Sequence, residues 1–401
     1  AAFGGSAGTA GPAEAPSPFL PGRIALRARA LHAMGRTLDE VVLDASREAG
    51  GWNAKIDSRQ VAGAVQWRPA GPSATGSLQL RLARLNVPDA SDEHNVVDAL
   101  ASSIDELPAI DLVADQFMLR GHDFGKLEVK AHTGTSAADP VWTLDKLQIE
   151  QPGATLTGSG SWRVPRRLRA DANAERRTLL SFSIDVRDAG ATLDRLGLAH
   201  TLSDGKGKLE GRVAWRGSPL SIDYPTLSGK LSLDLENGQI LSVEPGAARL
   251  LGVLSLQGLL RFAMLDFRTL SGRGLVFDRI AGNGTIENGV GTIQDFELRS
   301  PQIIASMSGT ANLLRETQDL RVDVVPRINA TSTSIAAAFI NPVLGIGTLA
   351  AQLLFADEFS KVFTQHYRIT GSWANPQIGK LEDNKAQAPT FQNRADPALP
   401  R

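Results

Sequence analysis

Apolar residues alternate with polar or small ones along much of this chain of 401 residues. The alternation is clearest in LQLRLARL (78–85), KLEVKAH (126–132), KLEGRVAW (208–215), KLSLDLE (230–236) and LRVDV (320–324). Successive side chains of a β-strand point to opposite faces of its sheet, so each segment predicts a strand with one apolar face and one face toward water. Little helical pattern separates these segments. The sequence therefore predicts an antiparallel β body rather than βαβ units.

Short clusters of Gly, Asn, Pro and Asp separate the alternating segments. We expect turns at QPG (151–153), ENGQ (236–239), AGNGT (281–285), ENGVG (287–291) and SPQ (300–302). Two regions also align without a gap: LQIEQPGATLTGSGSW (147–162) and FELRSPQIIASMSGTA (296–311). In both, an alternating segment ends at a proline turn and a second segment returns, which predicts a hairpin.

Glycine and tryptophan recur at a fixed spacing within the alternating segments. Three pairs follow the pattern G-x-x-x-W and one segment has a shorter form: Gly63 and Trp67, Gly158 and Trp162, Gly211 and Trp215, and ITGSW at 369–373. A large aromatic ring can cover the gap that a glycine leaves on the same face of a sheet. We therefore interpret the pattern as strand packing without chemistry of its own.

Two stretches depart from the alternation and predict helices, at 245–262 and 334–366. The first begins with a proline and carries leucines at helical spacing. The second lies for most of its length within a region, 328–356, that contains no charged side chain. Pro342 and Gly345 interrupt its apolar residues, so an ordinary transmembrane helix is not favoured. We expect this helix to dock on something apolar.

Composition and motifs argue against several classes of function. The chain has 42 basic and 43 acidic residues, which gives no overall field to attract nucleic acid, and it has no cysteine. The six histidines show no metal-binding spacing. GGSAG at 4–8 matches a serine-hydrolase motif, but it lies in an Ala/Gly/Pro-rich stretch without the strand and helix that such a motif needs. We expect no catalytic residues, no metal, no cofactor and no nucleic-acid partner.

A sheet with one apolar face needs a cover for that face. The chain offers few helices to provide it, and its aromatic content is 5%. Either the strands close on themselves as a sandwich, or the sheet curls into a trough whose apolar lining is filled by a ligand. The composition alone does not decide between these arrangements.

Several segments, in this order, resemble the C-terminal part of the AsmA-like proteins of the YhdP type. The resemblance covers about 24–380 and is most specific over 200–376. Its segments are LPAIDLVADQFMLRGHDFGKLEVKAH, WTLDKLQIEQPGATLTGSGSW, LSDGKGKLEGRVAWRGSP, LSGKLSLDLENGQILSVEPGAARLLGVLSLQGLLR, DFRTLSGRGLVFDRIAGNGTIENG and PQIIASMSGTANL.

The resemblance implies a protein of a Gram-negative envelope. It implies an inner-membrane anchor that precedes this chain and a periplasmic body that reaches the inner leaflet of the outer membrane. It also implies a curled β-sheet whose groove carries phospholipid, as in bridge-like lipid transfer proteins, and no catalytic residues.

With the resemblance, the predicted fold is mainly β: an elongated, curled antiparallel sheet that forms an open apolar groove shaped like a taco. We expect a disordered linker at 1–23, the groove at 24–327, a helical segment with a closing strand at 328–380 and a disordered tail at 381–401. The residues predicted to line the groove are Leu127, Val129, Val213, Leu231, Leu233, Leu235, Ile286, Ile293 and Leu298.

The C-terminal helix is expected either to plug the open end of the groove or to contact the outer membrane. Its first turns are apolar on every side, and a helix of that kind is buried in protein or in lipid. The residues proposed for this contact are Phe339, Leu344, Ile346, Leu349, Leu353, Leu354 and Phe355.

The function predicted is non-enzymatic phospholipid transport between the inner and outer membranes. The alternative is an envelope scaffold or assembly module that binds proteins rather than lipid. A polysaccharide-acting enzyme is disfavoured because aromatic platforms for sugar rings are scarce.

Overall fold

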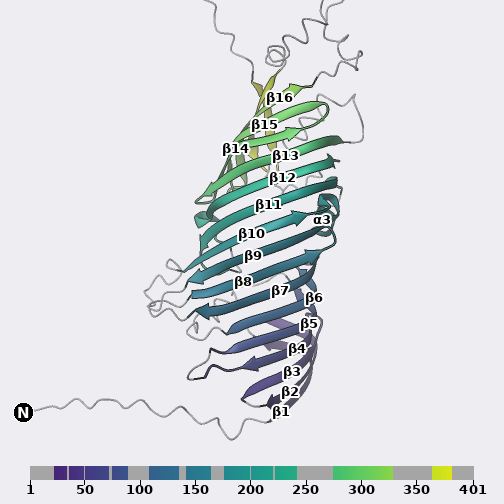
Figure 1. Cartoon of the computed structure of the whole chain (residues 1–401), viewed down its shortest axis with the longest axis vertical. Coiled ribbons are helices and arrows are strands. Elements are labelled where there is room, and N and C mark those ends of the chain that lie inside the picture. Colours follow the sequence, from purple (N-terminus) through teal and green to yellow (C-terminus); the bar gives the residue numbers. More distant parts are fainter. Residues whose placement is uncertain are drawn as a thin grey trace, which may run out of the picture. The chain divides into compact units, whose positions relative to one another are not determined.

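The computed structural model describes residues 22–33, 36–48, 50–71, 75–88, 108–134, 141–163, 176–198, 200–219, 222–241, 274–327 and 364–381. These residues form an open, largely antiparallel sheet of 18 strands (Figure 1). The mainly β fold predicted from the alternation is confirmed. The chain divides into two compact units, which are described separately below.

Unit 1 holds β1 to β8 and most of β9. Its strands are β1 (Arg23–Ala33), β2 (Arg36–Glu48), β3 (Gly51–Asp57), β4 (Val61–Arg68), β5 (Ser77–Val87), β6 (Ala109–Leu119), β7 (His122–Gly134), β8 (Val141–Gln151) and β9 (Ala154–Arg163). Each strand pairs with the next along the chain. β5 and β6 pair in parallel, with Ser77 opposite Ala109. This pair is an exception within the largely antiparallel sheet, and the long connection from Val87 to Ala109 makes it possible.

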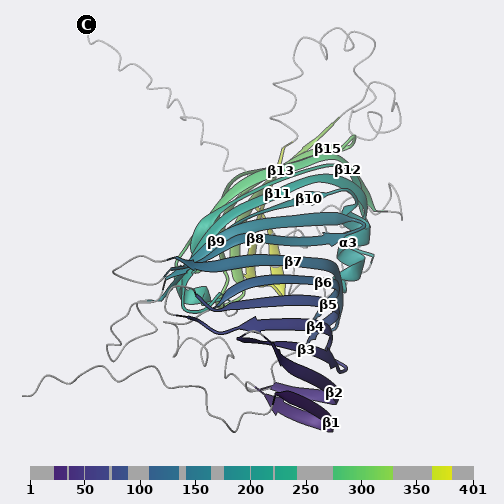
Figure 2. The same ribbon diagram turned by 60° about the horizontal axis from the view of Figure 1, so that its bottom comes forward.

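Unit 2 holds most of β10 and all later strands. Its strands are β10 (Arg177–Val186), β11 (Leu202–Arg216), β12 (Ser228–Ile240), β13 (Leu275–Glu287), β14 (Val290–Arg299), β15 (Ile303–Asn312), β16 (Thr317–Pro326), β17 (Gln365–Ser372) and β18 (Pro376–Leu381). From β11 onward every neighbouring pair is antiparallel. Figure 2 shows β10 to β13 bending along their length.

Two of the five predicted turns are wrong. ENGQ (236–239) lies inside β12, and AGNGT (281–285) lies inside β13. In ENGQ, Asn237 has a φ of 54° and lies opposite Gly205 of β11, whose φ is 91°, so the pair forms an irregularity within the ladder. In AGNGT the glycines remain in the strand, where Gly282 allows a phenylalanine ring to approach its Cα closely. The turns at 151–153, 287–291 and 300–302 are confirmed, as are both predicted hairpins, β8–β9 and β14–β15.

A short helix that the sequence analysis did not predict, α3 (Ala189–Arg195), connects β10 to β11. Asp188 caps its first turn, with the side-chain Oδ1 accepting a hydrogen bond from the backbone N–H of Ala191 at 2.9 Å. Gly190 is required here because a Cβ would lie 2.8 Å from the backbone oxygen of Leu202. A 3₁₀ turn, η2 (Tyr224–Thr226), precedes β12.

The helices predicted at 245–262 and 334–366 lie outside the described residues, apart from the last three positions of the second: Thr364, which precedes β17, and Gln365 and His366, which belong to it. None of the described helices is long and apolar enough to cross a membrane. The predicted linker and tail also lie almost entirely outside the described part of the chain.

Candidate functional site

Apolar side chains of unit 2 line up in rows that run across the strands. In one row Leu235 of β12 faces Ile280 of β13, which faces Leu298 of β14. The row continues through Ala305 of β15 to Val324 of β16. Because residues that face each other across a ladder share one side of the sheet, these positions define an apolar face.

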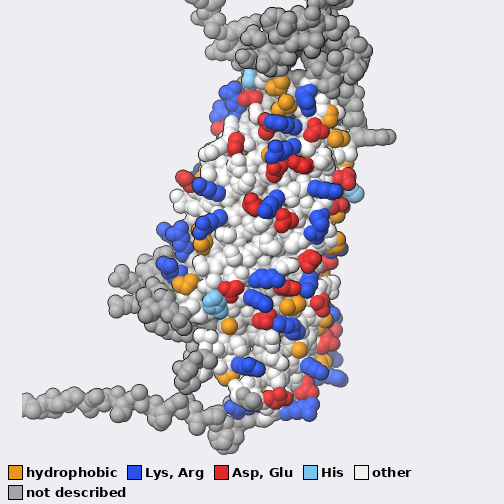
Figure 3. Space-filling model, viewed as in Figure 1, with side chains coloured by type: hydrophobic (Ala, Val, Ile, Leu, Met, Phe, Trp, Pro, Cys, Tyr) orange, Lys and Arg blue, Asp and Glu red, His pale blue; other side chains and the backbone are white. Residues whose placement is uncertain are grey.

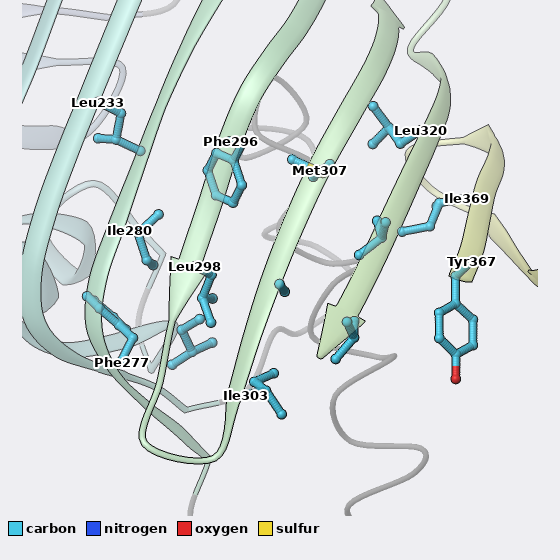
Figure 4. Packing of buried hydrophobic residues seen from close by; sticks show 14 residues of the cluster. Leu233, Phe277, Ile280, Phe296, Leu298, Ile303, Met307, Leu320, Tyr367 and Ile369 are labelled. Atoms are coloured by element: carbon cyan, nitrogen blue, oxygen red, sulfur yellow. The ribbon is translucent and has the colours of Figure 1, made fainter. Parts of the chain in front are cut away.

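The central cluster of this apolar face packs side chains from β12 to β17, and Figure 4 shows them on neighbouring strands. Its buried members are Leu233, Ile240, Phe277, Ile280, Phe296, Leu298, Ile303, Ala305, Met307, Leu320, Val322, Val324, Tyr367 and Ile369. An apolar side chain that leaves water contributes about 1.5–3 kcal/mol. These side chains form a continuous apolar area on one face of the sheet in unit 2.

A second group, here called the rim cluster, lies where the strands of unit 2 end. Its buried members are Trp215, Leu227, Ile286, Leu313 and Trp373, with Leu180, Val213 and Leu231 packed against them. Leu231 and Leu233 are two residues apart on β12, so the rim cluster lies on the same apolar face as the central cluster.

Unit 1 has its own apolar cluster. Leu82, Ala114, Phe117 and Leu127 are buried, with Val129 among the residues packed against them. The register supports a shared face, since Leu82 lies opposite Ala114 and Ala114 lies opposite Leu127.

The structure places each of the nine predicted lining residues in one of these clusters. Leu233, Leu235, Ile293 and Leu298 belong to the central cluster, Val213, Leu231 and Ile286 to the rim cluster, and Leu127 and Val129 to the cluster of unit 1. Their contact with lipid stays a prediction. The seven residues proposed for the plug or membrane contact, Phe339 to Phe355, lie outside the described residues.

Sequence reasoning missed several central members of the apolar face, including Phe277, Phe296 and Tyr367. The register shifts between Ile293 and Phe296, so these two residues share a face although they are three apart. A period of two counted from Ile293 assigns Phe296 to the wrong face, whereas one counted from Leu298 assigns it to the apolar face. In the structure each ring lies against a glycine of the neighbouring strand, Phe277 against Gly238 and Phe296 against Gly282.

The opposite face of the same strands is charged. Arg279 of β13 bridges to Asp234 of β12 at 2.5 Å, and Arg368 of β17 bridges to Asp319 of β16 at 2.7 Å. In each pair the hydrogen bond from the arginine lowers the pKa of the aspartate below its usual value. Figure 3 shows basic and acidic side chains interspersed on the viewed surface, with few hydrophobic ones between them.

Unit 1 repeats this arrangement around Glu128 of β7. The ammonium groups of Lys146 and Lys126 lie 2.6 and 2.9 Å from its carboxylate oxygens. The hydrogen bonds from Lys146 and Lys126 lower the pKa of Glu128 from 4.5 to about 2. Paired charges of both signs keep this face in water without giving it a strong net field.

The tryptophans are gathered at strand ends. In unit 1, Trp52 and Trp142 are the second residues of β3 and β8, and Trp67 and Trp162 are the next-to-last residues of β4 and β9. Trp52 lies opposite Trp67, and the pairing from β4 to β9 brings all four ends to one rim of the unit. The recurring Gly and Trp pattern therefore marks where a strand stops at this rim.

Unit 2 shows the same placement. Trp215 is the next-to-last residue of β11, and Trp373 directly follows β17. Both belong to the rim cluster. Helix α3 precedes β11 and so lies at the opposite rim of this unit (Figure 1). The glycines that aromatic rings cover most closely in this unit lie under phenylalanines, not under these indoles: Phe182 lies over Gly211 and Phe277 over Gly238.

Among the described residues, no group of three or more His, Asp or Glu side chains could hold a metal ion. What the described part of the chain offers is a pair of surfaces, one apolar and continuous across strands, the other charged. These features define a class of protein, an open β-sheet with one apolar and one charged face.

Comparison with known proteins gives the particular family. The profile of the YhdP family, described as "YhdP protein", matches residues 6–378, and the chain belongs to this family. The chain is 28% identical over 263 residues to a protein of Escherichia coli (strain K12) named "Intermembrane phospholipid transporter YhdP". The aligned part is 65% of this chain and 20% of that relative, so the chain spans about a fifth of the relative's length. No solved structure matches.

Proposed function

We propose that this chain is part of a protein that transports phospholipid between the two membranes of a Gram-negative envelope, without catalysing a reaction. The observation that carries the proposal is the apolar face, whose rows continue from strand to strand in unit 2. The printed name of the E. coli relative supports phospholipid as the cargo.

The physical argument is the cost of exposing acyl chains. A sixteen-carbon chain in water costs on the order of 13 kcal/mol, at about 0.8 kcal/mol per methylene. A carrier must therefore offer apolar surface at each step along the path. A row such as Leu235, Ile280 and Leu298 provides that surface across three strands, while charged residues of the other face keep the sheet soluble.

The cellular setting belongs to the same proposal. The body lies in the periplasm, is held at the inner membrane by a segment outside this chain and reaches the inner leaflet of the outer membrane. Residues 339–355 provide the contact with that leaflet or close the end of the lipid path.

Gly291 offers a direct test because it lies on the apolar face with space above it. It pairs with Ile286 and with Ala311, both buried, and a Cβ added there would meet only the backbone oxygen of Ala311 at 3.6 Å. Gly291→Leu should place a bulky side chain on the lipid path without a steric conflict with the backbone. The neighbouring Thr292 lies on the opposite face, so Thr292→Leu is the matched control.

The measurement is native mass spectrometry of the whole chain, extracted gently from an envelope, together with lipid transfer between vesicles. We expect phospholipid to co-purify with the wild-type chain, and we expect Gly291→Leu to reduce transfer several-fold at an unchanged melting temperature. Thr292→Leu should transfer normally. Repeated absence of lipid from the wild-type chain would contradict transport and favour the envelope scaffold.

A further inference from the structure

Three indole N–H groups at the tryptophan rims are buried without a hydrogen-bond partner among the described residues: those of Trp142, Trp162 and Trp373. A buried indole normally donates its N–H, because leaving the group unpaired costs free energy. Trp373 is 7% exposed, and its neighbours in the rim cluster are apolar or aromatic. Its N–H is therefore a donor that lacks an acceptor in an otherwise apolar region.

The backbone around Trp373 is fixed. The N–H of Trp373 donates to the backbone oxygen of Glu316 at 2.8 Å, and the N–H of Leu313 donates to that of Gly289 at 2.9 Å. Gly289 in turn donates to the backbone oxygen of Leu227 at 2.8 Å. These hydrogen bonds join the connections of the rim and hold the backbone that carries the indole in a defined position.

At the rim of unit 2 the surroundings change from apolar to charged over a few residues. The rim cluster ends the apolar face, and the next connection carries the exposed Arg315 and Glu316. An exposed arginine also follows each of Trp67, Trp162 and Trp215 directly in the sequence. An indole placed between an apolar and a charged region has the environment that tryptophan occupies at membrane interfaces.

We propose that the glycerol-ester region of a bound phospholipid lies along the rim of unit 2 that carries Trp215 and Trp373, and that the indole N–H of Trp373 donates a hydrogen bond to an ester carbonyl oxygen. The inference rests on the proposed function and adds an orientation, with acyl chains across the apolar face and headgroups at this rim. The ester carbonyl is preferred to the phosphate because it adjoins the acyl chain and is uncharged, whereas burying the phosphate beside Leu313 and Ile286 would be costly.

The test compares a diester phospholipid with its diether analogue, which has the same headgroup and chains but no ester carbonyl. Binding of each lipid from vesicles to the purified whole chain is measured for the wild type and for Trp373→Phe, which keeps an aromatic ring and removes the donor. One net hydrogen bond corresponds to about a three- to tenfold preference for the diester. We expect the wild type to show that preference and Trp373→Phe to lose it while still binding both lipids.

Trp215→Phe is the control, since Trp215 lies in the same cluster and has an interaction partner within the chain. It should keep the preference. A second readout is the indole N–H resonance of Trp373, assigned by its loss in Trp373→Phe, which should shift on binding the diester and not the diether.

The possible results separate the two proposals. If the wild-type chain binds neither lipid, the proposed function fails. If it binds both equally well, lipid binding stands and the ester contact is wrong. A loss of the preference in Trp215→Phe as well would show a general loosening of the rim and overturn the assignment to the Trp373 donor.

Discussion

At the scale of single residues, the packing of aromatic rings against glycines sets which glycines the sheet needs. Gly282 and Gly284 lie two residues apart on β13 and face the same side of the sheet. A Cβ at Gly282 would lie 2.9 Å from both the Cα and the Cδ2 of Phe296. A Cβ at Gly284 would meet only the backbone oxygen of Thr292, at 3.4 Å.

We therefore expect Gly282→Ala to destabilise the protein by about 1–3 kcal/mol, because the buried Phe296 has little room to move. Gly284→Ala should be close to neutral, or stabilise slightly by restricting the unfolded chain. Urea denaturation followed by tryptophan fluorescence measures both. Equal effects of the two substitutions would show that the contact with Phe296 does not determine the need for glycine.

At the scale of elements, two turns with nearly the same backbone differ in their surroundings. Arg120 and Gly121 join β6 to β7 with φ angles of 52° and 81°, and Asn288 and Gly289 join β13 to β14 with 48° and 76°. Gly121 has nothing within 4 Å of a built Cβ, whereas at Gly289 a Cβ would lie 2.4 Å from the backbone oxygen of Tyr224. Both sites favour glycine, but the second also needs it for close approach.

Alanine substitutions at Gly121 and Gly289 separate the effect of the left-handed backbone from the effect of the close contact with Tyr224. Gly121→Ala should cost about 1–2 kcal/mol for the left-handed backbone alone. Gly289→Ala should cost more, because the loop that contains Tyr224 must also shift. Amide hydrogen exchange in β6–β7 and in β13–β14 gives the local stability of each hairpin. The interpretation is wrong if the β13–β14 hairpin loses no more protection than the β6–β7 hairpin.

The elements also show where reading the sequence succeeds. Strands such as β7, β11 and β12 follow from strict alternation, because burial on one face selects every second residue. Glycine was the misleading residue. The Gly- and Asn-rich segments around Asn237 and Gly282 predict turns. In the structure Asn237 lies inside β12, where its φ is positive, and Gly282 lies inside β13, where it contacts the ring of Phe296. A glycine inside a strand can be told from a glycine in a turn only when the neighbouring strand is known.

At the scale of the whole molecule, both units carry carboxylates whose pKa values are lowered by paired cations. In unit 1 the hydrogen bond from Arg81 lowers the pKa of Asp111, and those from Lys146 and Lys126 lower the pKa of Glu128 to about 2; in unit 2 the hydrogen bond from Arg279 lowers the pKa of Asp234. A carboxylate whose pKa is lowered in the folded state stabilises the protein at pH values above the ordinary pKa of that group. That contribution is lost as pH falls through the folded value.

The protein should therefore lose stability as the pH falls below about 5, with the contribution of Glu128 disappearing between its ordinary value of 4.5 and about 2. Glu128→Gln should be less stable than wild type at pH 7 and should show a shallower decline in acid. The denaturation midpoint measured from pH 7 to pH 3 tests this, with Glu316→Gln in an exposed connection as the control. High salt should reduce the difference, since these pairs are partly exposed. An identical acid profile for wild type and Glu128→Gln would rule out this role.

For the molecule as a whole, alternation was enough to place Leu233, Leu235 and Leu298 on one apolar face, because those positions follow regular strand geometry. Counted from Leu298, the same alternation also places Phe296 there, but it does not reveal the register shift that puts Ile293, three residues before Phe296, on the same face. The sequence also does not predict that the tryptophans of each unit lie at one rim. That placement depends on the direction of every strand, including the parallel pair β5–β6.

Each described strand pairs with the next one along the chain. Where the connection is short, as between β13 and β14 or β14 and β15, the contacts are near in sequence and cost little chain entropy, so these hairpins can form early. Such a chain can also gain or lose a hairpin during evolution while the pairings elsewhere stay the same, as in repeat proteins. Selection can then change the number of strands without changing the alternation of apolar and charged residues within each strand. Relatives of very different length can therefore pack their strands in the same way.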